Sequence, residues 1–594
     1  MANTRTSKNE KPHGESSKID PAVHRRILRS LNDALGTDDL MHGKVSVTHH
    51  HEGGGAEHED NPAERKKKPR KIMNRELAQD IINHRDWNFP LGFRHIDEAF
   101  EIVRDFDRAR LDTLLHHFSA ASFGSWANFP QPIPQRGPGG MAGVVHAALL
   151  HTGKVLFITA DETTLLWDPE NTAPTTFEDP VNQPHTMPGG YSQLCGHHVF
   201  LSDGKLLSVG GGGYGPNPLA QWGYKFDPVT NVWTRTTGPM SEAKWYPTAV
   251  ALGDSRVLVT CGDRSGDMDI YDEATDTFSP VVSVDKPFPS LYPGLHLLPN
   301  HAVFYSRTGW GTAGPGGGPF TADDQSAYFM MTGTLTGAWN NIGPALPGIA
   351  DRTKGMSVML LGNTPPYVRV MVIGGADNST SNTYEMIDVS ALSGATNWSA
   401  PIPFPDGLRR SLGSAVLLPD GNVFVCGGVQ SQNSPCSMFN PQTNVWSPND
   451  ELPSVRDYHS VALLLPSGKV MMAGWLNTTI EVFSPPYLFA GARPVIAAAP
   501  AMVHHGQSFF IESPDAASIS KVVLVRPMAV THQTDSEQKV LEMAYVHDHA
   551  NPTRLGLVAP HGGHPHSIAQ QGYYMLFAIS NGGVPSVAKW IYLH

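Results

Sequence analysis

Residues 456–475 read RDYHSVALLLPSGKVMMAGW, and this stretch decides the fold of the chain. Two apolar runs, VALLL and VMMAG, stand on either side of the turn sequence PSG at residues 466–468. Apolar runs of strand length around a short turn with glycine predict a β-hairpin. Tyr458 and His459 stand side by side just before the first run. The same kind of hairpin recurs along the chain, and this recurrence predicts the fold.

Hairpins of this kind follow one another from Val144 onwards: VVHAALLHTGKVLFIT, GHHVFLSDGKLLSVGG, PTAVALGDSRVLVTCG, PGLHLLPNHAVFYS, SVMLLGNTPPYVRVMVIGG, GSAVLLPDGNVFVCGG and HSVALLLPSGKVMMAG. Several are followed by an aromatic residue and a second turn, as in YKFDPVTNVW and SMFNPQTNVW. Their spacing is close to the kelch period of roughly 50 residues. Seven repeats of about four strands each predict an all-β fold with a seven-bladed β-propeller.

The segments on either side of the repeats differ in character, and we divide the chain into four parts. Residues 1–75 are polar and carry a His/Gly tract, which predicts a disordered tail, and residues 76–122 have helical spacing. The propeller is expected over 123–490, with the segment GSWANF closing the ring by pairing into the last blade. Residues 491–594 carry short alternating strands, which predicts an immunoglobulin-like β-sandwich.

Composition excludes several classes of function. The formal net charge of −12 argues against nucleic acid as a partner. No apolar run is long enough to span a membrane, and the first residues lack the apolar core of a signal peptide. The four cysteines form no CxxC motif and are too few for a disulfide scaffold. We expect a monomer.

The hairpins share a register that brings reactive residues together. The position nine residues before the turn residue is equivalent from hairpin to hairpin. Four repeats place reactive residues at this position and two place apolar ones: Cys195, Tyr246, Tyr292 and His459, then Val144 and Leu412. The first strand of each propeller blade lines the central channel, so equivalent positions form a ring around the axis. Neighbouring strand residues point to opposite faces, so Tyr458 and His459 can serve one centre only from a bend at the strand's entrance.

A propeller with this ring resembles the copper-radical oxidases, galactose oxidase and glyoxal oxidase. The resemblance covers roughly residues 125–594 and rests on LCGHHVFLSDGKLL, KWYPTAVALGDSRVL, RDYHSVALLLPSGKV with SPPYLFAGARP, and VTHQTDSEQKVLEM. It implies that Cys195 and Tyr246 form a thioether-linked radical cofactor. It also implies copper ligands: Tyr246, His459 and His532 in equatorial positions and Tyr458 in the axial one. His532 has to come from the sandwich domain on a loop that enters the propeller channel.

The chain departs from galactose oxidase at two points. Arg264 stands where galactose oxidase keeps the tryptophan that stacks on the thioether, and Trp310 or a tryptophan from another loop is a candidate to substitute for it. The carbohydrate-binding domain that precedes the propeller of galactose oxidase is replaced by the helical segment. Both departures favour the glyoxal-oxidase-like branch and small aldehydes over galactose.

The resemblance implies oxidation of a small aldehyde or primary alcohol by dioxygen, with hydrogen peroxide as the second product. Family members are commonly secreted or in the cell envelope, although no export signal is recognisable here. The rival interpretation is a kelch module without copper that binds a protein or glycan. All five site residues of the resemblance are present, which favours the oxidase.

Overall fold

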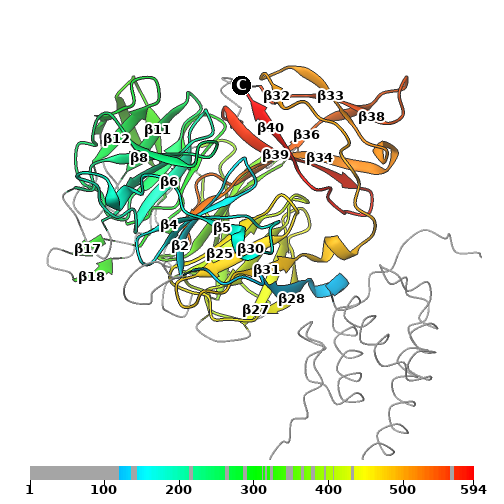
Figure 1. The fold of residues 1–594 in the computed structure, drawn as a ribbon, viewed down its shortest axis with the longest axis horizontal. Helices are drawn as coiled ribbons and strands as arrows, with labels where there is room; N and C mark the ends of the chain where they lie inside the picture. Colours follow the sequence, from blue (N-terminus) through cyan, green and yellow to red (C-terminus); the bar gives the residue numbers. More distant parts are fainter. Residues whose placement is uncertain are drawn as a thin grey trace, which may run out of the picture. The chain divides into compact units, whose positions relative to one another are not determined.

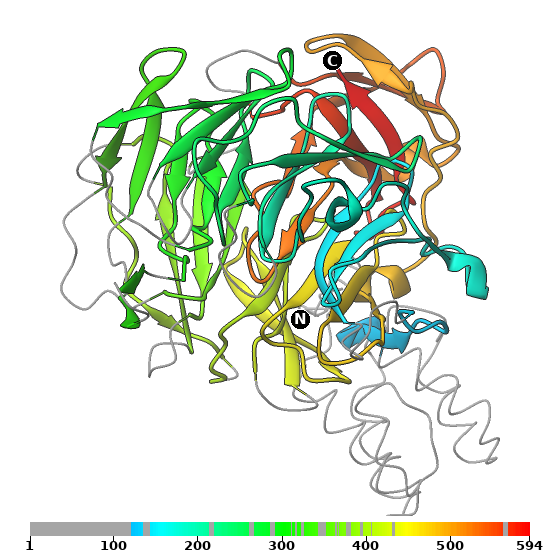
Figure 2. The ribbon, with the colours of Figure 1, turned by 60° about the vertical axis from the view of Figure 1, so that its left-hand side comes forward.

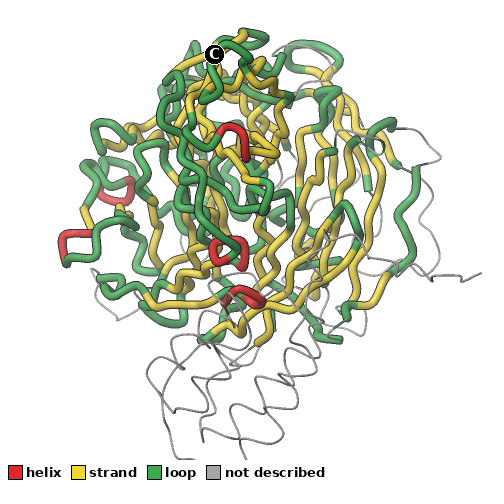
Figure 3. Tube along the Cα trace, turned by 90° about the vertical axis from the view of Figure 1, so that its right-hand side faces the viewer, coloured by secondary structure: helices red, strands yellow, loops and turns green. Residues whose placement is uncertain are grey.

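The computed structural model describes residues 120–594 apart from short gaps. The gaps are 135–142, 213–218, 261–266, 285–290, 311, 315–317, 322–325, 343–351, 363–364, 366, 376–381, 393–395, 406, 430–433 and 562–567. The expected tail over 1–75 and nearly all of the expected helical segment over 76–122 lie outside the described residues. Figure 3 shows that the described part is built of strands and loops, with only short helical turns. The 3-10 turns are η2 (Pro174–Thr176), η3 (Pro184–Thr186), η4 (Pro486–Phe489) and η5 (Ala516–Ser518).

Small, mostly antiparallel sheets follow one another along the chain (Figures 1 and 2). The first three are formed by β2 (Val144–Leu149), β3 (Val155–Thr159), β4 (Thr164–Trp167) and β5 (Phe177–Glu178); β6 (Gly196–Phe200), β7 (Leu206–Gly210), β8 (Gly223–Asp227) and β9 (Val232–Arg235); and β10 (Thr248–Ala251), β11 (Arg256–Thr260), β12 (Met268–Asp272) and β13 (Thr277–Pro280). The next two use β14 (Val282–Val284), β15 (Leu295–Leu297), β16 (Val303–Tyr305), β19 (Ala327–Met331) and β20 (Thr336–Asn341); and β21 (Met356–Leu361), β22 (Val368–Ile373), β23 (Thr383–Asp388) and β24 (Ile402–Pro403). The last two use β25 (Gly413–Leu417), β26 (Val423–Gly427), β27 (Ser434–Asn440) and β28 (Val445–Leu452); and β29 (Ser460–Leu464), β30 (Val470–Gly474), β31 (Glu481–Ser484) and β1 (Ser125–Asn128). Two further strands, β17 (Thr312–Gly314) and β18 (Gly318–Thr321), pair only with each other in the described part of the chain.

The turn residues used for the register share one backbone conformation. Gly153, Gly204, Gly421 and Gly468 have φ between 77° and 92°, and Ser255 and His301 adopt a similar left-handed φ of 63° and 65°. Glycine reaches this conformation without steric cost, whereas serine and histidine do not. The common conformation confirms that the hairpins are equivalent despite their different turn sequences.

The inner strands of neighbouring sheets contact one another in chain order. Strand β6 contacts β10, β10 contacts β15, β21 contacts β25, β25 contacts β29, and β29 returns to contact β2. Strand β1 pairs with β31, as expected for the segment GSWANF, so the start of the array completes its last sheet. This order is the one expected of propeller blades, and the blade count of seven stays a prediction.

Buried ion pairs fix the loop that leads into several inner strands. Arg352 contacts Glu385 of β23 at 3.2 Å, and Arg456 contacts Glu481 of β31 at 3.0 Å, with all four side chains inaccessible to solvent. Lys244 forms the corresponding pair with Asp269 of β12. Lys244 stands two positions before Tyr246, and Arg456 stands three positions before His459, both residues of the predicted ring. The pairs therefore hold the entrance of the inner strand against the third strand of the same sheet.

The C-terminal part forms two facing sheets, in the order β32-β40-β39-β34-β36 and β33-β38-β37. Their strands are β32 (Met502–Val503), β33 (Ser508–Glu512), β34 (Ile519–Arg526), β36 (Lys539–Met543), β37 (Tyr545–His547), β38 (Arg554–Val558), β39 (Gly572–Ser580) and β40 (Lys589–Leu593). Alternating apolar residues of both sheets, among them Ile511, Leu524 and Leu576, form one buried core. Among the described residues, no helix is long and apolar enough to cross a membrane.

The segment between β34 and β36 leaves the sandwich and enters the sheet array (Figure 2). Its strand β35 (Ala529–Thr531) pairs with β2 and contacts β6 and β29. Ser536 donates to the Ala249 carbonyl of β10, and Gln538 exchanges hydrogen bonds with Ala415 and Leu417 of β25. Residues 531–539 are all buried. The expected entry of a sandwich loop among the inner strands is thus observed, and it carries His532.

Candidate metal centre

The residues of the predicted ring share an unusual backbone conformation. Left-handed φ angles occur at Cys195 (66°), Tyr246 (59°), Tyr292 (46°), Leu412 (61°) and His459 (61°). This conformation costs a non-glycine residue roughly 1–3 kcal/mol and is concentrated at functional sites. In the observed backbone, the Tyr246 N–H donates to the Cys195 carbonyl, and the Tyr292 N–H donates to the Tyr246 carbonyl. These bonds link the entrances of successive inner strands.

Two sheets differ from the counted register. Val144 lies in β2 without a left-handed φ, because the pairing of β2 with β3 shifts between Val144 and His146. In the fifth sheet Lys354 takes the ring position: its φ is 62°, and its carbonyl accepts the Leu412 N–H at 2.9 Å. The Lys354 ammonium lies 5.8 Å from the centre of the Trp310 ring. A cation is therefore added to the predicted set of ring residues.

Tyr458 and His459 both face the centre because the chain bends before β29. A turn closed by the Ser460 N–H on the Asp457 carbonyl places His459 in the left-handed conformation. The two rings then stack, with centroids 3.7 Å apart. The bend expected at the strand's entrance is observed, and it removes the alternation that would separate adjacent strand residues.

His532 reaches the same point from the sandwich. Its ring centroid lies 4.4 Å from that of His459 and 5.1 Å from that of Tyr246. The Thr531 hydroxyl lies 2.8 Å from His532 Nδ1 and donates to the Val145 carbonyl at 3.3 Å. A proton on Nδ1 satisfies both contacts, because the hydroxyl then accepts from His532 and donates to Val145; in this tautomer Nε2 keeps its lone pair. A hydrogen bond of this kind sets the tautomer of metal-binding histidines.

Tyr246 lies between aromatic rings and touches a second phenol. Trp245 stacks on one side at 4.1 Å, Tyr292 stacks at 4.4 Å, and Trp310 lies edge-on at 5.4 Å. The Tyr246 and Tyr458 hydroxyl oxygens are 2.5 Å apart. Burial raises the pKa of Tyr246 far above its usual value, and the neighbouring Cys195 and Tyr292 raise it further. Its phenolate form therefore needs a nearby cation.

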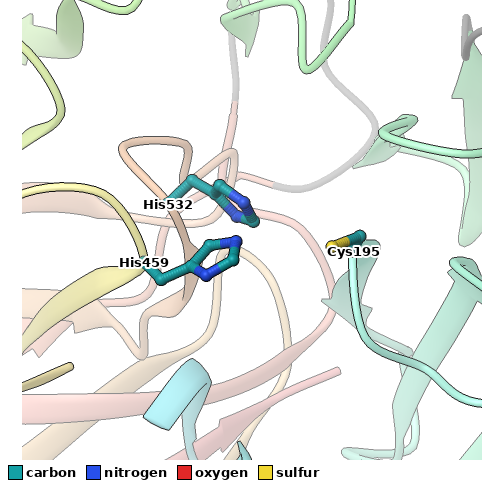
Figure 4. A group of neighbouring side chains, drawn as sticks. All are labelled: Cys195, His459 and His532. Atoms are coloured by element: carbon teal, nitrogen blue, oxygen red, sulfur yellow. The ribbon is translucent and has the colours of Figure 1, made fainter. Parts of the chain in front are cut away.

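Cys195 lies beside the two histidines (Figure 4). The Cys195 sulfur and one ring nitrogen from each of His459 and His532 lie within 4.8 Å of one another. Burial raises the pKa of the Cys195 thiol to about 12, partly offset by its interaction with the Tyr246 side chain. The thiol is therefore protonated at neutral pH in the metal-free protein.

The donor atoms at this point fit a transition metal such as copper. Among the described residues, both ring nitrogens of His459 and Nε2 of His532 are buried without a hydrogen-bond partner. Buried polar atoms without a partner are rare in proteins, and a bound ion accounts for them at this site. Burial lowers the pKa of His459 to about 3 and also lowers that of His532, so both rings are neutral. Neutral imidazoles and phenol oxygens are donors that suit Cu(II).

Sequence reasoning missed two residues at this centre. The ring that stacks on Tyr246 is Trp245, the preceding residue in the motif KWYP, and its position next to Tyr246 was the available signal. Trp310, the tryptophan that the sequence offers as a substitute, lies edge-on to Tyr246 instead. Lys354 was missed because no turn residue of the fifth repeat marks the register. Arg264 lies outside the described residues.

Comparisons with known proteins agree with this geometry. Residues 493–593 match the family described as galactose oxidase-like, early set domain. Aldehyde oxidase GLOX1 of Arabidopsis thaliana is 31% identical over 67% of this chain and 71% of its own length. Aldehyde oxidase GLOX of Vitis pseudoreticulata is 28% identical over 67% of this chain and 81% of its own length. Galactose oxidase of Gibberella zeae is 26% identical, covering 68% of this chain and 61% of that enzyme.

A solved structure shares the fold. It is described as a novel fungal alcohol oxidase of the AA5 family in complex with copper, and it superimposes with a TM-score of 0.61 over 80% of this chain and 99% of its own. Because the two sequences are only 21% identical, this similarity shows a common fold and nothing further. With the aldehyde and galactose oxidases as relatives and the early set domain matched, the chain belongs to the copper-radical oxidase family of galactose oxidase and glyoxal oxidase.

Proposed function

We propose that this chain oxidises small aldehydes or primary alcohols with dioxygen and releases hydrogen peroxide, using a radical held on Tyr246 cross-linked to Cys195. The observation that carries the proposal is the contact between the Tyr246 and Tyr458 hydroxyls, 2.5 Å apart, beside two buried neutral histidines. Two phenols, two imidazoles and a thiol in one buried cluster have little use in a structural core. They have a clear use in a two-electron oxidation.

Four side chains would hold copper: Tyr246, Tyr458, His459 and His532. The free nitrogens of the two histidines and the contact between the two phenol oxygens support this set. When bound there, copper supplies a Lewis-acidic position for the substrate oxygen and accepts one of the two electrons.

The chain's own residues carry the proton and the hydrogen atom. Tyr458 accepts the proton of the substrate hydroxyl, and the Tyr246 oxygen radical removes a hydrogen atom from the substrate carbon. Trp245 and Tyr292 cover the faces of Tyr246 and keep water from the radical. An alcohol RCH2OH with O2 gives RCHO and H2O2, and a hydrated aldehyde RCH(OH)2 with O2 gives RCOOH and H2O2.

The cross-link is supported by the packing of Cys195 and Tyr246 in one buried cluster, where the thiol interacts with the Tyr246 side chain. The new bond joins the sulfur to the ring carbon beside the phenol oxygen. One hydrogen leaves the thiol and one leaves the ring, and O2 takes up both electrons and both protons as peroxide. The sulfur donates electron density to the ring, which makes the radical easier to form.

Small aldehydes are the proposed substrates, and Lys354 adds a preference among them. Its ammonium lies over Trp310, and the Trp310 ring is edge-on to Tyr246. A cation at that place favours an aldehyde that carries a carboxylate. Galactose, a large neutral sugar, is expected to react weakly or not at all.

The test compares wild type with Cys195→Ser, using intact-protein mass, copper content and peroxide output. Wild type should lose two hydrogens after copper loading in air and should produce peroxide from glyoxal. The variant should keep copper, keep its unprocessed mass and lose most of its peroxide production. A wild type without mass loss, or an equally active variant, contradicts the radical mechanism.

A second candidate has support in the cluster of one thiol with two imidazoles. Cys and His donors in trigonal arrangement also form electron-transfer copper sites. In that case Cys195→Ser removes a ligand and lowers copper affinity strongly, while wild type produces no peroxide. The same two proteins therefore separate the candidates.

A further inference from the structure

The backbone N–H of Cys195 has a different kind of partner from those of three other ring residues. Tyr246, Tyr292 and Leu412 each donate this N–H to the carbonyl of the ring residue in the preceding sheet. Cys195 donates instead to a side chain, Nε2 of His146, at 3.1 Å. The His146 imidazole therefore accepts the Cys195 N–H, whereas a backbone carbonyl accepts the N–H of each of the other three residues.

The preceding sheet explains the exception. Strand β2 starts without a left-handed residue at the ring position, and its pairing shifts between Val144 and His146. The shift is a bulge, which re-aims the side chains next to it. It places His146, with 1% of its surface exposed, at the edge of β6 where Cys195 begins its turn.

His146 also neighbours the histidine that comes from the sandwich. It is the register partner of Thr531 in the pairing of β2 with β35, and its ring centroid lies 6.3 Å from that of His532. One side chain thus joins the backbone of Cys195 to the strand that delivers His532. The two parts of the centre come from different domains, so a joint of this kind sets their relative position.

The protonation state of His146 is fixed by its contacts. Because Nε2 accepts the Cys195 N–H, the ring proton is on Nδ1, which is buried without a partner in the described part of the chain. Burial lowers the pKa of His146 well below its usual value, and His198, His459 and His197 lower it further. The ring stays neutral at ordinary pH, and its acceptor lone pair is retained.

We propose that His146 is a positioning residue for the cofactor: its Nε2 holds Cys195 in the left-handed conformation that keeps the thiol beside Tyr246, and so sets the rate at which the thioether forms. This inference rests on the proposed function. The reaction it controls is the one balanced above, with a carbon–sulfur bond formed, two hydrogens lost and O2 reduced to peroxide. His146 does not touch the substrate.

The test uses two substitutions that differ in one property. His146→Gln keeps an oxygen acceptor close to the place of Nε2, and His146→Leu fills a similar volume without an acceptor. The matched control is His198→Leu, because His198 is equally buried and its ring lies 5.3 Å from that of His146. The full-length chain is produced without copper, loaded with Cu(II) in air, and sampled over time for intact mass and copper content.

We expect the loss of two hydrogens to be at least tenfold slower in His146→Leu than in wild type, because this variant removes the acceptor of the Cys195 N–H. In His146→Gln and His198→Leu the rate should stay within about threefold of wild type, because both keep an acceptor for that N–H. All four proteins should bind copper. Should His146→Leu fail to fold, His146→Asn takes its place, because its side chain is too short to reach the Cys195 N–H and should show the same slowing.

Two results overturn the inference in distinguishable ways. Cross-linking of His146→Leu at the wild-type rate, with copper bound, removes the role of His146 and leaves the proposed function intact. A copper-loaded wild type that never loses two hydrogens removes the radical cofactor and the role of His146 together.

Discussion

Thr531→Val should weaken copper binding although Thr531 is not a proposed ligand. The Thr531 hydroxyl holds His532 Nδ1 at 2.8 Å and is anchored on the Val145 carbonyl. Valine has almost the shape of threonine, so the substitution removes the hydroxyl with its contacts to His532 and Val145 and changes little else. Without it, His532 is free to take the tautomer in which Nε2 carries the proton and cannot bind a metal.

The magnitude follows from the burial of both groups. Thr531 is fully buried and His532 is 1% exposed, so water does not replace the lost partner. A buried donor left unsatisfied costs about 1–3 kcal/mol. Each 1.4 kcal/mol corresponds to about tenfold in affinity, so copper should bind roughly 10–100-fold more weakly, the usual range for such outer partners.

The assay is competition for Cu(II) between the protein and a chelator of known affinity, in wild type, Thr531→Val and Thr531→Ser. The serine variant keeps the hydroxyl and removes only a methyl group, so it should bind copper within about threefold of wild type. Equal affinities for the valine and serine variants would show that the hydroxyl does not set the His532 tautomer.

Three further predictions concern substrate choice, acid stability and the ion pairs. Lys354→Met should raise KM about tenfold for glyoxylate, because a hydrogen bond to a charged group contributes about 1.5–3 kcal/mol; an equal change for neutral glyoxal in the peroxide assay would contradict this. Burial lowers the pKa of His296 to about 3, so below pH 6.5 protons bind the unfolded chain first and stability falls as pH falls. The free energy of unfolding, measured with urea at pH 7.5 and at pH 5, should decrease by about 2 kcal/mol less in His296→Gln than in wild type. Identical decreases would exclude a contribution of His296 to the acid sensitivity. Glu481→Ala leaves the Arg456 charge buried and should lower the free energy of unfolding by about 3–5 kcal/mol in the same assay. Glu178→Ala, at the partly exposed pair with Lys154, should lower it by less than about 1 kcal/mol. Similar decreases for the two variants would mean that the buried pair adds nothing to stability.

The amino-acid sequence by itself determined the repeated hairpin and most of the ring. Apolar runs separated by turn residues are local features that involve neighbours a few positions apart, so the hairpins can be predicted directly from the sequence. Counting back from those turns found Cys195, Tyr246, Tyr292 and His459, and all four have the same left-handed conformation. The position nine residues before the turn is the ring position in the repeats that have the common turn length and no bulge in the first strand.

The repeat pattern does not mark the ring position in two repeats, one with a longer turn and one with a bulge. The fifth repeat has the longer connection GNTPPY after β21, so no turn residue marks Lys354. In the first repeat the bulge in β2 shifts the register, so the count gives Val144 while the contact with Cys195 comes from His146. A single inserted residue reverses the faces of a strand, and a pattern of period two does not reveal it.

Only the tertiary structure decided what surrounds the ring. The stacking of Trp245 on Tyr246, the tautomer of His532 set by Thr531, and the acceptor that His146 offers to Cys195 all depend on backbone bends that local pattern does not specify. Thr531 and Cys195 lie in different domains and are separated by hundreds of residues. Contacts of that range are fixed by the packing of the inserted segment between β34 and β36 among the inner strands, because burial leaves each polar group only the partners that the fold places beside it.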